Sequence, residues 1–223
     1  MSLYTFSKTD QLPTNKIITG LRMEKCSNVK LLSEMGSTTE DDVTNRLLNR
    51  HVAFVAYVNN QPAAFGWMAT QKAKIGELNH EIVLPEGNRY LWNFRTLEAF
   101  RGLGIYPALL QYIIQSEIER AERFWIIHAP ENKSSLSGII KAGFQFVGTL
   151  FTNEEGIAAI ETTALSDDCR SILNYMNIKI SESLPASCWN CSSPYLKKRT
   201  MKCCCEKAEK ECVGKSLLAM ASS

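Results

Sequence analysis

The stretch that decides the fold is Tyr90-Leu-Trp-Asn-Phe-Arg-Thr-Leu97, followed by Glu98-Ala-Phe-Arg101-Gly-Leu-Gly104-Ile-Tyr-Pro-Ala-Leu-Leu110. Its first part is rich in aromatic residues and has the length typical of a strand. Strict alternation along that strand places Phe94 on one face with Tyr90 and Trp92, and Leu91 on the other. Two glycines then end the strand, and apolar residues at helical spacing begin after them. The stretch predicts a strand, a glycine turn and a helix.

The residues on either side extend this unit into a sheet. Residues 124–127 are apolar and bounded by charge, as in a buried strand, so the chain predicts a strand–helix–strand crossover. Two hairpins flank the unit: residues 51–58 with 62–70, and residues 144–151 with 157–163. A further strand is expected within 17–26, helices at 28–35, 41–50 and 132–142, and an irregular or loosely paired excursion at 71–88. The predicted fold class is α/β: a mixed, mostly antiparallel central sheet with flanking helices.

Cysteine and charge divide the chain into three parts. Six of the eight cysteines lie between Cys188 and Cys212. Residues 188–223 also carry seven Lys and Arg against three Glu, whereas the whole chain has a net charge of only +2. We therefore predict a domain at 1–165, a helix or linker at 166–187, and a Cys-rich basic tail at 188–223.

Composition excludes several classes of protein. With 45% hydrophobic residues the chain can bury a core, so wholesale disorder is excluded. The near balance of 25 Lys and Arg with 23 Asp and Glu gives no overall attraction to nucleic acid or an anionic membrane. No apolar run approaches the roughly 20 residues of a membrane span, and the N-terminus lacks the pattern of a secretory signal. The sequence predicts a soluble, cytoplasmic protein with no membrane or nucleic-acid partner, and leaves its oligomeric state open.

The glycine turn at Arg101-Gly-Leu-Gly104 can bind an anion. Glycines between a strand and a helix let backbone N–H groups converge, and the helix N-terminus adds its positive dipole end. The turn is neither a P-loop nor a dinucleotide-binding loop, because it lacks the Lys-[Ser/Thr] of the first and the spacing of the second. Two glycines alone leave open a turn that serves only close strand–helix packing.

Two motifs together resemble the GNAT superfamily of N-acetyltransferases. Arg101-Gly-Leu-Gly104-Ile-Tyr106 is similar to the family's acetyl-CoA signature [Gln/Arg]-x-x-Gly-x-[Gly/Ala], with Tyr106 at the position where the family usually has a small residue. Asn132 lies eleven residues before Gly143-Phe144, a spacing common in the family. The resemblance covers residues 17–163 and not the Cys-rich tail.

The resemblance implies a GNAT-like acyl-CoA N-acyltransferase fold and acetyl-CoA as the acyl donor. Backbone amides of the turn would bind the CoA pyrophosphate, namely those of Gly102, Leu103, Gly104, Ile105 and Tyr106, with Arg101 at the start of the loop. Backbone groups of Phe94, Arg95 and Thr96 would bond the pantetheine, and Asn132 would reach the pantetheine arm or its thioester end. The Tyr106 side chain is expected to point away from the pyrophosphate and pack beside the cofactor.

The acid–base residues are less clearly indicated. In the family a Tyr seven residues after the Asn often protonates the departing thiolate, and here that position is Ile139, which cannot donate a proton. His128 is the first candidate for acid–base work because histidine titrates near neutrality, and the alternative is a strand-end histidine bonded to the Pro130 turn. Glu98 is a second catalytic candidate, with a solvated acid as its alternative.

The tail offers a separate candidate site. Cys188-Trp-Asn-Cys191 is a C-x₂-C knuckle, and Cys203-Cys204-Cys205 and Cys212 follow it. Four thiolates from this set, Cys188, Cys191, Cys203 and Cys212, could hold a tetrahedral zinc ion. Disulfides and free thiols stay open as alternatives.

Taken together, the sequence predicts an enzyme that transfers an acetyl group from acetyl-CoA to an amine of a small molecule or peptide. The transfer would occur by direct attack in a ternary complex. The first alternative is a non-catalytic acyl-CoA-binding or regulatory module, which Ile139 favours. The second is an interaction protein that acts through its basic Cys-rich tail.

Overall fold

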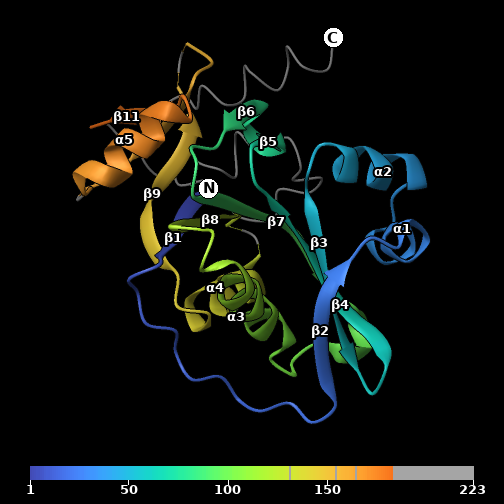
Figure 1. The fold of residues 1–223 in the computed structure, drawn as a ribbon. Helices are drawn as coiled ribbons and strands as arrows, with labels where there is room; N and C mark the ends of the chain where they lie inside the picture. The colour runs from blue at the N-terminus through green and yellow to red at the C-terminus, as the bar shows by residue number, and fades with distance from the viewer. Residues whose placement is uncertain (131, 154, 164, 183–223) are drawn as a thin grey trace, which may run out of the picture.

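The structure is a computed structural model that describes residues 1–130, 132–153, 155–163 and 165–182, and Figure 1 labels its elements. The large sheet contains β1 (Ser2–Ser7), β2 (Leu21–Cys26), β3 (Val52–Val58), β4 (Gln61–Ala69), β7 (Asn88–Thr96), β8 (Arg123–His128), β9 (Gln145–Thr152), β10 (Ala158–Glu161) and β11 (Lys179–Ser181). The helices are α1 (Val29–Gly36), α2 (Glu40–Leu48), α3 (Ile105–Glu117), α4 (Lys133–Lys141) and α5 (Asp167–Tyr175). A separate hairpin consists of β5 (Lys72–Ile75) and β6 (His80–Val83).

The nine strands of the large sheet follow the order β11-β10-β9-β1-β8-β7-β4-β3-β2 within the described part of the chain. The β7–β8 and β10–β11 pairs are parallel, and every other pair in this sheet is antiparallel. The helix α3 connects β7 to β8, as a parallel pair requires. The predicted fold class, a mixed and mostly antiparallel sheet with flanking helices, is confirmed.

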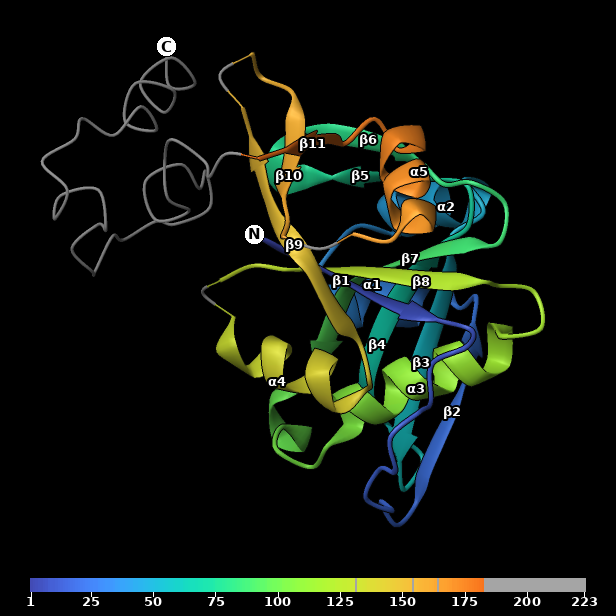
Figure 2. The same cartoon turned by 90° about the vertical axis from the view of Figure 1, so that its left-hand side faces the viewer.

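Helices cover both faces of the sheet. The helices α3 and α4 lie on one face, and α1, α2, α5 and the β5–β6 hairpin lie on the other (Figure 2). The face under α3 is packed by fully buried side chains such as Leu109, Ile113 and Phe124. The opposite face is packed by separate clusters around Phe65 under α1 and around Leu173 on α5. Each face of the sheet therefore has its own core.

Local signals account for the positions of the helices. The Thr39 side chain accepts a hydrogen bond from the Asp42 amide and caps α2, whose first turn contains three acidic residues. Asn28 and Ser166 cap α1 and α5 in the same way. No helix in the described part of the chain is long and apolar enough to cross a membrane.

Three segments differ from the sequence prediction or extend it. The strand β1 was not predicted, and it is inserted between β8 and β9 with Leu3, Tyr4 and Phe6 all buried. Because both of its faces are covered, β1 lacks the apolar–polar alternation that marks a strand at the sequence level. The expected excursion at 71–88 contains the ordered hairpin β5–β6. Residues 167–181 form α5 and β11, and β11 extends the sheet by pairing with β10.

The Cys-rich tail lies outside the described residues. The cysteines predicted as zinc ligands, Cys188, Cys191, Cys203 and Cys212, belong to that part of the chain. The zinc site therefore stays a prediction from the sequence.

Candidate functional site

The strand β7 has a bulge close to the point where it stops pairing with β8. The strand pairs with β8 only from Asn88 to Leu91. On its other side, Trp92 pairs with Trp67 and Arg95 with Phe65, so β7 has two residues where β4 has only Gly66. One of these two residues, Asn93, has a φ of 51°, in the left-handed region. A bulge of this kind bends a strand and re-aims the side chains that follow it.

Because of the bulge, Phe94 lies on the face of β7 opposite to the one predicted from the sequence. The extra residue moves Phe94 to the face of Leu91, where both pack in the core beneath α3, while Trp92 stays on the opposite face. Gly66 on β4 gives the Phe94 ring its space, because a side chain at Gly66 would overlap that ring. Strict alternation from the sequence was therefore wrong for Phe94, since one inserted residue reverses the face of everything after it.

The glycine turn follows β7 and ends at the first turn of α3. Gly102 and Gly104 have φ values of 82° and 83°, which disfavour residues with a side chain. A Cβ atom at either glycine would meet no atom within 4 Å, so open space lies above this backbone. Gly104 is the N-cap of α3 and provides no side-chain cap. The first amides of α3 therefore have no intrahelical acceptor and are available to an anion.

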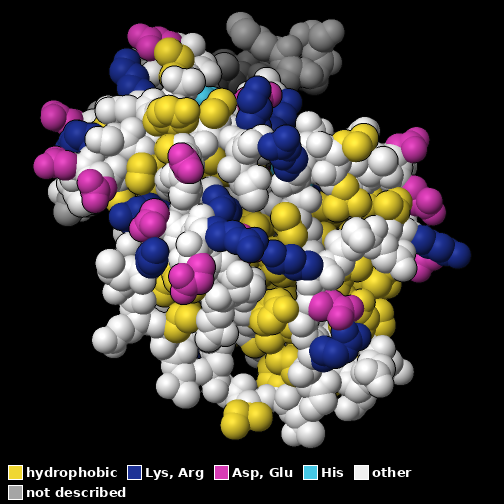
Figure 3. All heavy atoms as spheres, viewed as in Figure 1, with side chains coloured by type: hydrophobic (Ala, Val, Ile, Leu, Met, Phe, Trp, Pro, Cys, Tyr) yellow, Lys and Arg dark blue, Asp and Glu magenta, His cyan; other side chains and the backbone are white. Residues whose placement is uncertain are grey.

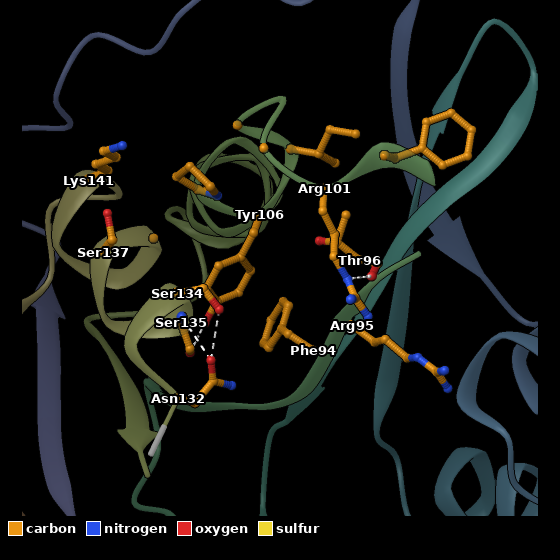
Figure 4. Close-up of a pocket in the computed structure, with 16 residues that line it drawn as sticks. Phe94, Arg95, Thr96, Arg101, Tyr106, Asn132, Ser134, Ser135, Ser137 and Lys141 are labelled. Atoms are coloured by element: carbon orange, nitrogen blue, oxygen red, sulfur yellow. Dashed lines mark hydrogen bonds between the residues drawn. The ribbon is translucent and has the colours of Figure 1, made fainter. Parts of the chain in front are cut away.

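The turn opens into a cavity of about 540 Å³ between β7, α3 and α4 (Figure 4). Its wall contains all the residues predicted to bind the cofactor except Leu103, whose side chain is exposed at the surface. Those on the wall are Phe94, Arg95, Thr96, Arg101, Gly102, Gly104, Ile105, Tyr106 and Asn132. Figure 3, viewed from the same side as Figure 1, shows a hollow with hydrophobic side chains near the middle of this face and Lys and Arg side chains along its border. Tertiary structure thus brings the two sequence motifs to one cavity.

The helix α4 forms a wall that sequence reasoning did not identify. Its contribution consists of Ser134, Ser135, Ser137, Gly138 and Lys141. The Asn132 Oδ1 atom caps this helix, accepting from the Ser135 amide and from Ser134 Oγ, each at 3.0 Å. In Figure 4 the amide nitrogen of Asn132 points away from α4. The signal available in the sequence was Asn132 itself, since Asn is a common helix N-cap and the serines that follow it then lie in the first turns of the helix.

Tyr106 connects the two walls. Its ring lies against Gly138 on α4, where a side chain would overlap it, and 5.4 Å from the ring of Phe94 between centroids. Its hydroxyl lies 3.3 Å from Ser135 Oγ. Burial raises the pKa of Tyr106 to about 12, so its phenol stays protonated at neutral pH.

The charged groups on the wall are cationic. Arg101 is mostly exposed and donates through Nε to the Thr96 carbonyl at 3.4 Å. Arg95 donates to Ser37 Oγ at 2.8 Å, which ties β7 to the end of α1. Lys141 lies on the opposite wall, and the described residues of the lining include no carboxylate or imidazole. The cavity therefore suits an anionic ligand.

The two catalytic candidates do not lie on the cavity wall. His128 is buried at the end of β8, and its Nε2 donates to the Asn132 carbonyl at 2.8 Å. This contact joins the end of β8 to the cap of α4, two residues beyond the Pro130 turn. Glu98 is exposed and lies 4.0 Å from Arg101 Nη1. Their catalytic roles stay predictions.

Several of the solved structures similar to the chain are described as GCN5-related or GNAT-family acetyltransferases. A GCN5-related N-acetyltransferase from Kribbella flavida has a TM-score of 0.48 and 13% identity, over 65% of this chain and 53% of its own. The ribosomal-protein-S18-alanine N-acetyltransferase from Escherichia coli has a TM-score of 0.47 and 15% identity, over 60% and 83% of the two chains. A GNAT-family protein from Novosphingobium aromaticivorans has a TM-score of 0.46 and 15% identity, over 65% and 59%.

At these identities and TM-scores the likeness concerns the fold and not the substrate. The chain spans about half the length of the Kribbella flavida structure that it matches. No family model matches the sequence. No curated protein matches it either.

Proposed function

We propose that the chain transfers an acetyl group from acetyl-CoA to an amine, by direct attack in a ternary complex. One observation carries the proposal: the β7 bulge and the glycine turn open into the same cavity, with free amides at one end and a separated strand edge at the other. A phosphate-bearing thioester that is extended along a strand fits these two features together. The open space above Gly102 and Gly104 supports this fit, because only a residue without a side chain leaves the backbone accessible.

Each wall has a separate part in this proposal. The amides from Gly102 to Tyr106 bind the pyrophosphate, and the backbone of Phe94, Arg95 and Thr96 bonds the pantetheine as an added strand would. Acetyl-CoA supplies the activated acyl group. A backbone donor for the oxyanion that forms during acyl transfer would come from the Asn93–Phe94 bulge, where β7 is free of β8.

Acyl transfer to an amine also requires two proton transfers. An acceptor ammonium must lose a proton before attack, and the departing thiolate must gain one. Ile139 is fully buried in the core and donates nothing. Tyr106 is the protonated phenol on the wall. His128 reaches the cavity only through the Asn132 carbonyl. We propose His128 and Glu98 as catalytic residues on the sequence argument alone.

A non-catalytic acyl-CoA-binding module is the second candidate function. The observation that favours it is the lining itself, which has no carboxylate or imidazole among its described residues. Such a module would bind acetyl-CoA through the same amides and turn over no amine.

Two measurements on the full chain separate the candidates. The first is the affinity for acetyl-CoA by calorimetry, and the second is thiol release from acetyl-CoA across a panel of amines. Binding with amine-dependent thiol release supports the transferase, and binding without release on any amine supports the module. Absence of binding contradicts both proposals.

A further inference from the structure

A cluster of rings and one guanidinium lies on the face of β7 that is turned away from the cavity. It consists of Arg46 on α2, His51 before β3, Trp67 on β4 and Trp92 on β7, and we call it the indole cluster. The Arg46 guanidinium carbon lies 4.8 Å from the centre of the Trp92 ring and 5.3 Å from that of Trp67. The His51 ring meets the Trp92 ring edge-on at 5.2 Å between centroids. Four side chains from four segments therefore converge at one place.

Two polar atoms of this cluster are buried without a partner. Trp92 Nε1 and His51 Nδ1 are shielded from solvent, and no described residue forms a hydrogen bond with either atom. Leaving a buried donor unpaired destabilises the folded chain. An indole N–H can only donate, so Trp92 requires an acceptor that the described chain does not provide.

Arg46 is also without a direct counter-charge. Arg46 is half-buried. No carboxylate oxygen of the described residues lies within 4.0 Å of its guanidinium nitrogens, the distance expected of an ion pair. Asp42, one helical turn earlier, instead accepts a hydrogen bond from Thr38 Oγ1 at 2.7 Å. Burial lowers the pKa of Arg46, and the negative charge of Asp42 opposes this only in part, so the surroundings disfavour the charge that an arginine nonetheless keeps. A nearby oxyanion would offset this penalty.

His51 adds no charge to the indole cluster. Burial is the main cause of a lowered pKa at His51. A hydrogen bond with the Lys72 backbone opposes this lowering, and the positive charge of Arg46 adds to it. The imidazole is therefore neutral near pH 7, and the only full charge of the indole cluster is the guanidinium.

The position of Trp92 links the indole cluster to the cavity. Trp92 directly precedes Asn93, the bulge residue at which β7 leaves β8. The cavity lies on the other face of this same segment. The acceptor of the proposed transfer would place its amine at the bulge and an anionic group at Arg46.

We propose that the indole cluster binds an oxyanion, a carboxylate or a phosphate, of the acceptor amine. Arg46 supplies the charge and a two-pronged donor, and the Trp92 indole N–H supplies the third hydrogen bond. That the bound molecule is the acceptor rests on the proposed transferase function, whereas the binding of an oxyanion by the indole cluster does not.

The test uses the indole N–H signals of the ¹⁵N-labelled full chain, which has four tryptophans. Trp92→Phe identifies the signal of Trp92. The probes are β-alanine, O-phosphoethanolamine and ethanolamine, which share a primary amine and differ in the anionic group. We expect β-alanine, O-phosphoethanolamine or both to shift the Trp92 signal saturably, and ethanolamine to leave it in place. The anion that shifts the signal identifies the source as carboxylate or phosphate.

The test variant is Arg46→Gln, and its matched control is Arg22→Gln. Arg22 also lies over an aromatic ring, that of Tyr57 at 4.2 Å, but outside the indole cluster. Arg46→Gln should weaken the anion-dependent shift at least tenfold, and Arg22→Gln should leave it unchanged. The Trp125 indole, which donates to Asn88 Oδ1 at 2.7 Å, reports whether each variant is folded.

If Arg46→Gln does not fold, thermal stabilisation by the same anions is measured in Trp92→Phe, where it should be lost. The proposal is overturned if neither anion shifts the Trp92 signal or if ethanolamine shifts it equally. It is also overturned if Arg46→Gln retains the full shift or if Trp92→Phe retains the full thermal stabilisation. The titration requires neither acetyl-CoA nor turnover. A protein that fails to bind acetyl-CoA thus contradicts the proposed function and not the oxyanion site.

Discussion

The two walls of the cavity are built in different ways. The wall of β7 and α3 comes from one continuous stretch, residues 94–107, and offers mainly backbone: a bulged strand edge, two left-handed glycines and the first amides of a helix. The wall of α4 offers side chains, the serines and Lys141, and its position depends on Gly138 packing against Tyr106 of the other wall. The glycine turn of the backbone wall is determined by neighbouring residues, whereas the side-chain wall depends on how two distant segments pack.

The largest effect is expected at His128, which supports the α4 wall. The catalytic role predicted for His128 implies that His128→Gln lowers turnover by about 10²-fold with little change in the affinity for acetyl-CoA. Steady-state kinetics and calorimetry on the same preparations separate the two quantities. Equal turnover in the wild-type protein and in His128→Gln would mean that His128 has a structural role, through its contact with the Asn132 carbonyl.

The next effect tests the contact between the walls. Gly138→Ala places a methyl group where the Tyr106 ring lies, and we expect a loss of about 1–3 kcal/mol in the free energy of unfolding, typical of overpacking. Denaturant unfolding measures this loss. In the double variant with Tyr106→Ala the loss from Gly138→Ala should disappear, and simple additivity of the two changes would show that the walls are not coupled.

The third change breaks the backbone wall alone. Gly104→Val puts a β-branched side chain at a φ of 83° and into the open space above the turn. We expect at least a tenfold loss of acetyl-CoA affinity, read by calorimetry on protein whose fold is checked by circular dichroism. An unchanged affinity in a folded variant would mean that the turn serves only strand–helix packing.

A smaller effect concerns the pH dependence of stability at Tyr106. Its pKa is raised from 10 to about 12 in the folded chain, so the unfolded chain loses this proton first. The contribution is fully present below pH 10 and is lost as the pH rises through 12. Tyr106→Phe should therefore flatten part of the alkaline loss of stability in denaturant melts between pH 9 and 12. Identical pH profiles for the two proteins would contradict the burial of this phenol between the walls.

The smallest effect is expected when residues 188–223 are removed. Every residue of both walls lies between Phe94 and Lys141, so the truncated chain should bind acetyl-CoA with the affinity of the full chain. Metal analysis of the full chain tests the tail itself, where the zinc prediction requires about one metal ion per chain. A large loss of CoA affinity on truncation would place part of the site in the tail.

The glycine turn of the backbone wall, the mixed sheet and the positions of the main helices could be predicted from the sequence. Glycine punctuation, helical spacing and capping residues act over a few neighbouring residues, so the turn at Gly102 and Gly104 and the start of α3 are readable without the fold. Asn132 could be assigned to the same site because the two motifs follow one another in the order found in the GNAT superfamily.

The remaining features depend on how distant parts of the chain pack together. The face of Phe94 depends on a bulge that opposes Gly66 of another strand, and β1 hides its strand character because both of its faces are buried. The serines of α4 reach the cavity because Tyr106 packs on Gly138, and the indole cluster gathers side chains from α2, the start of β3, β4 and β7. These features depend on contacts between residues far apart in the chain, and local propensity and periodicity carry no information about such contacts.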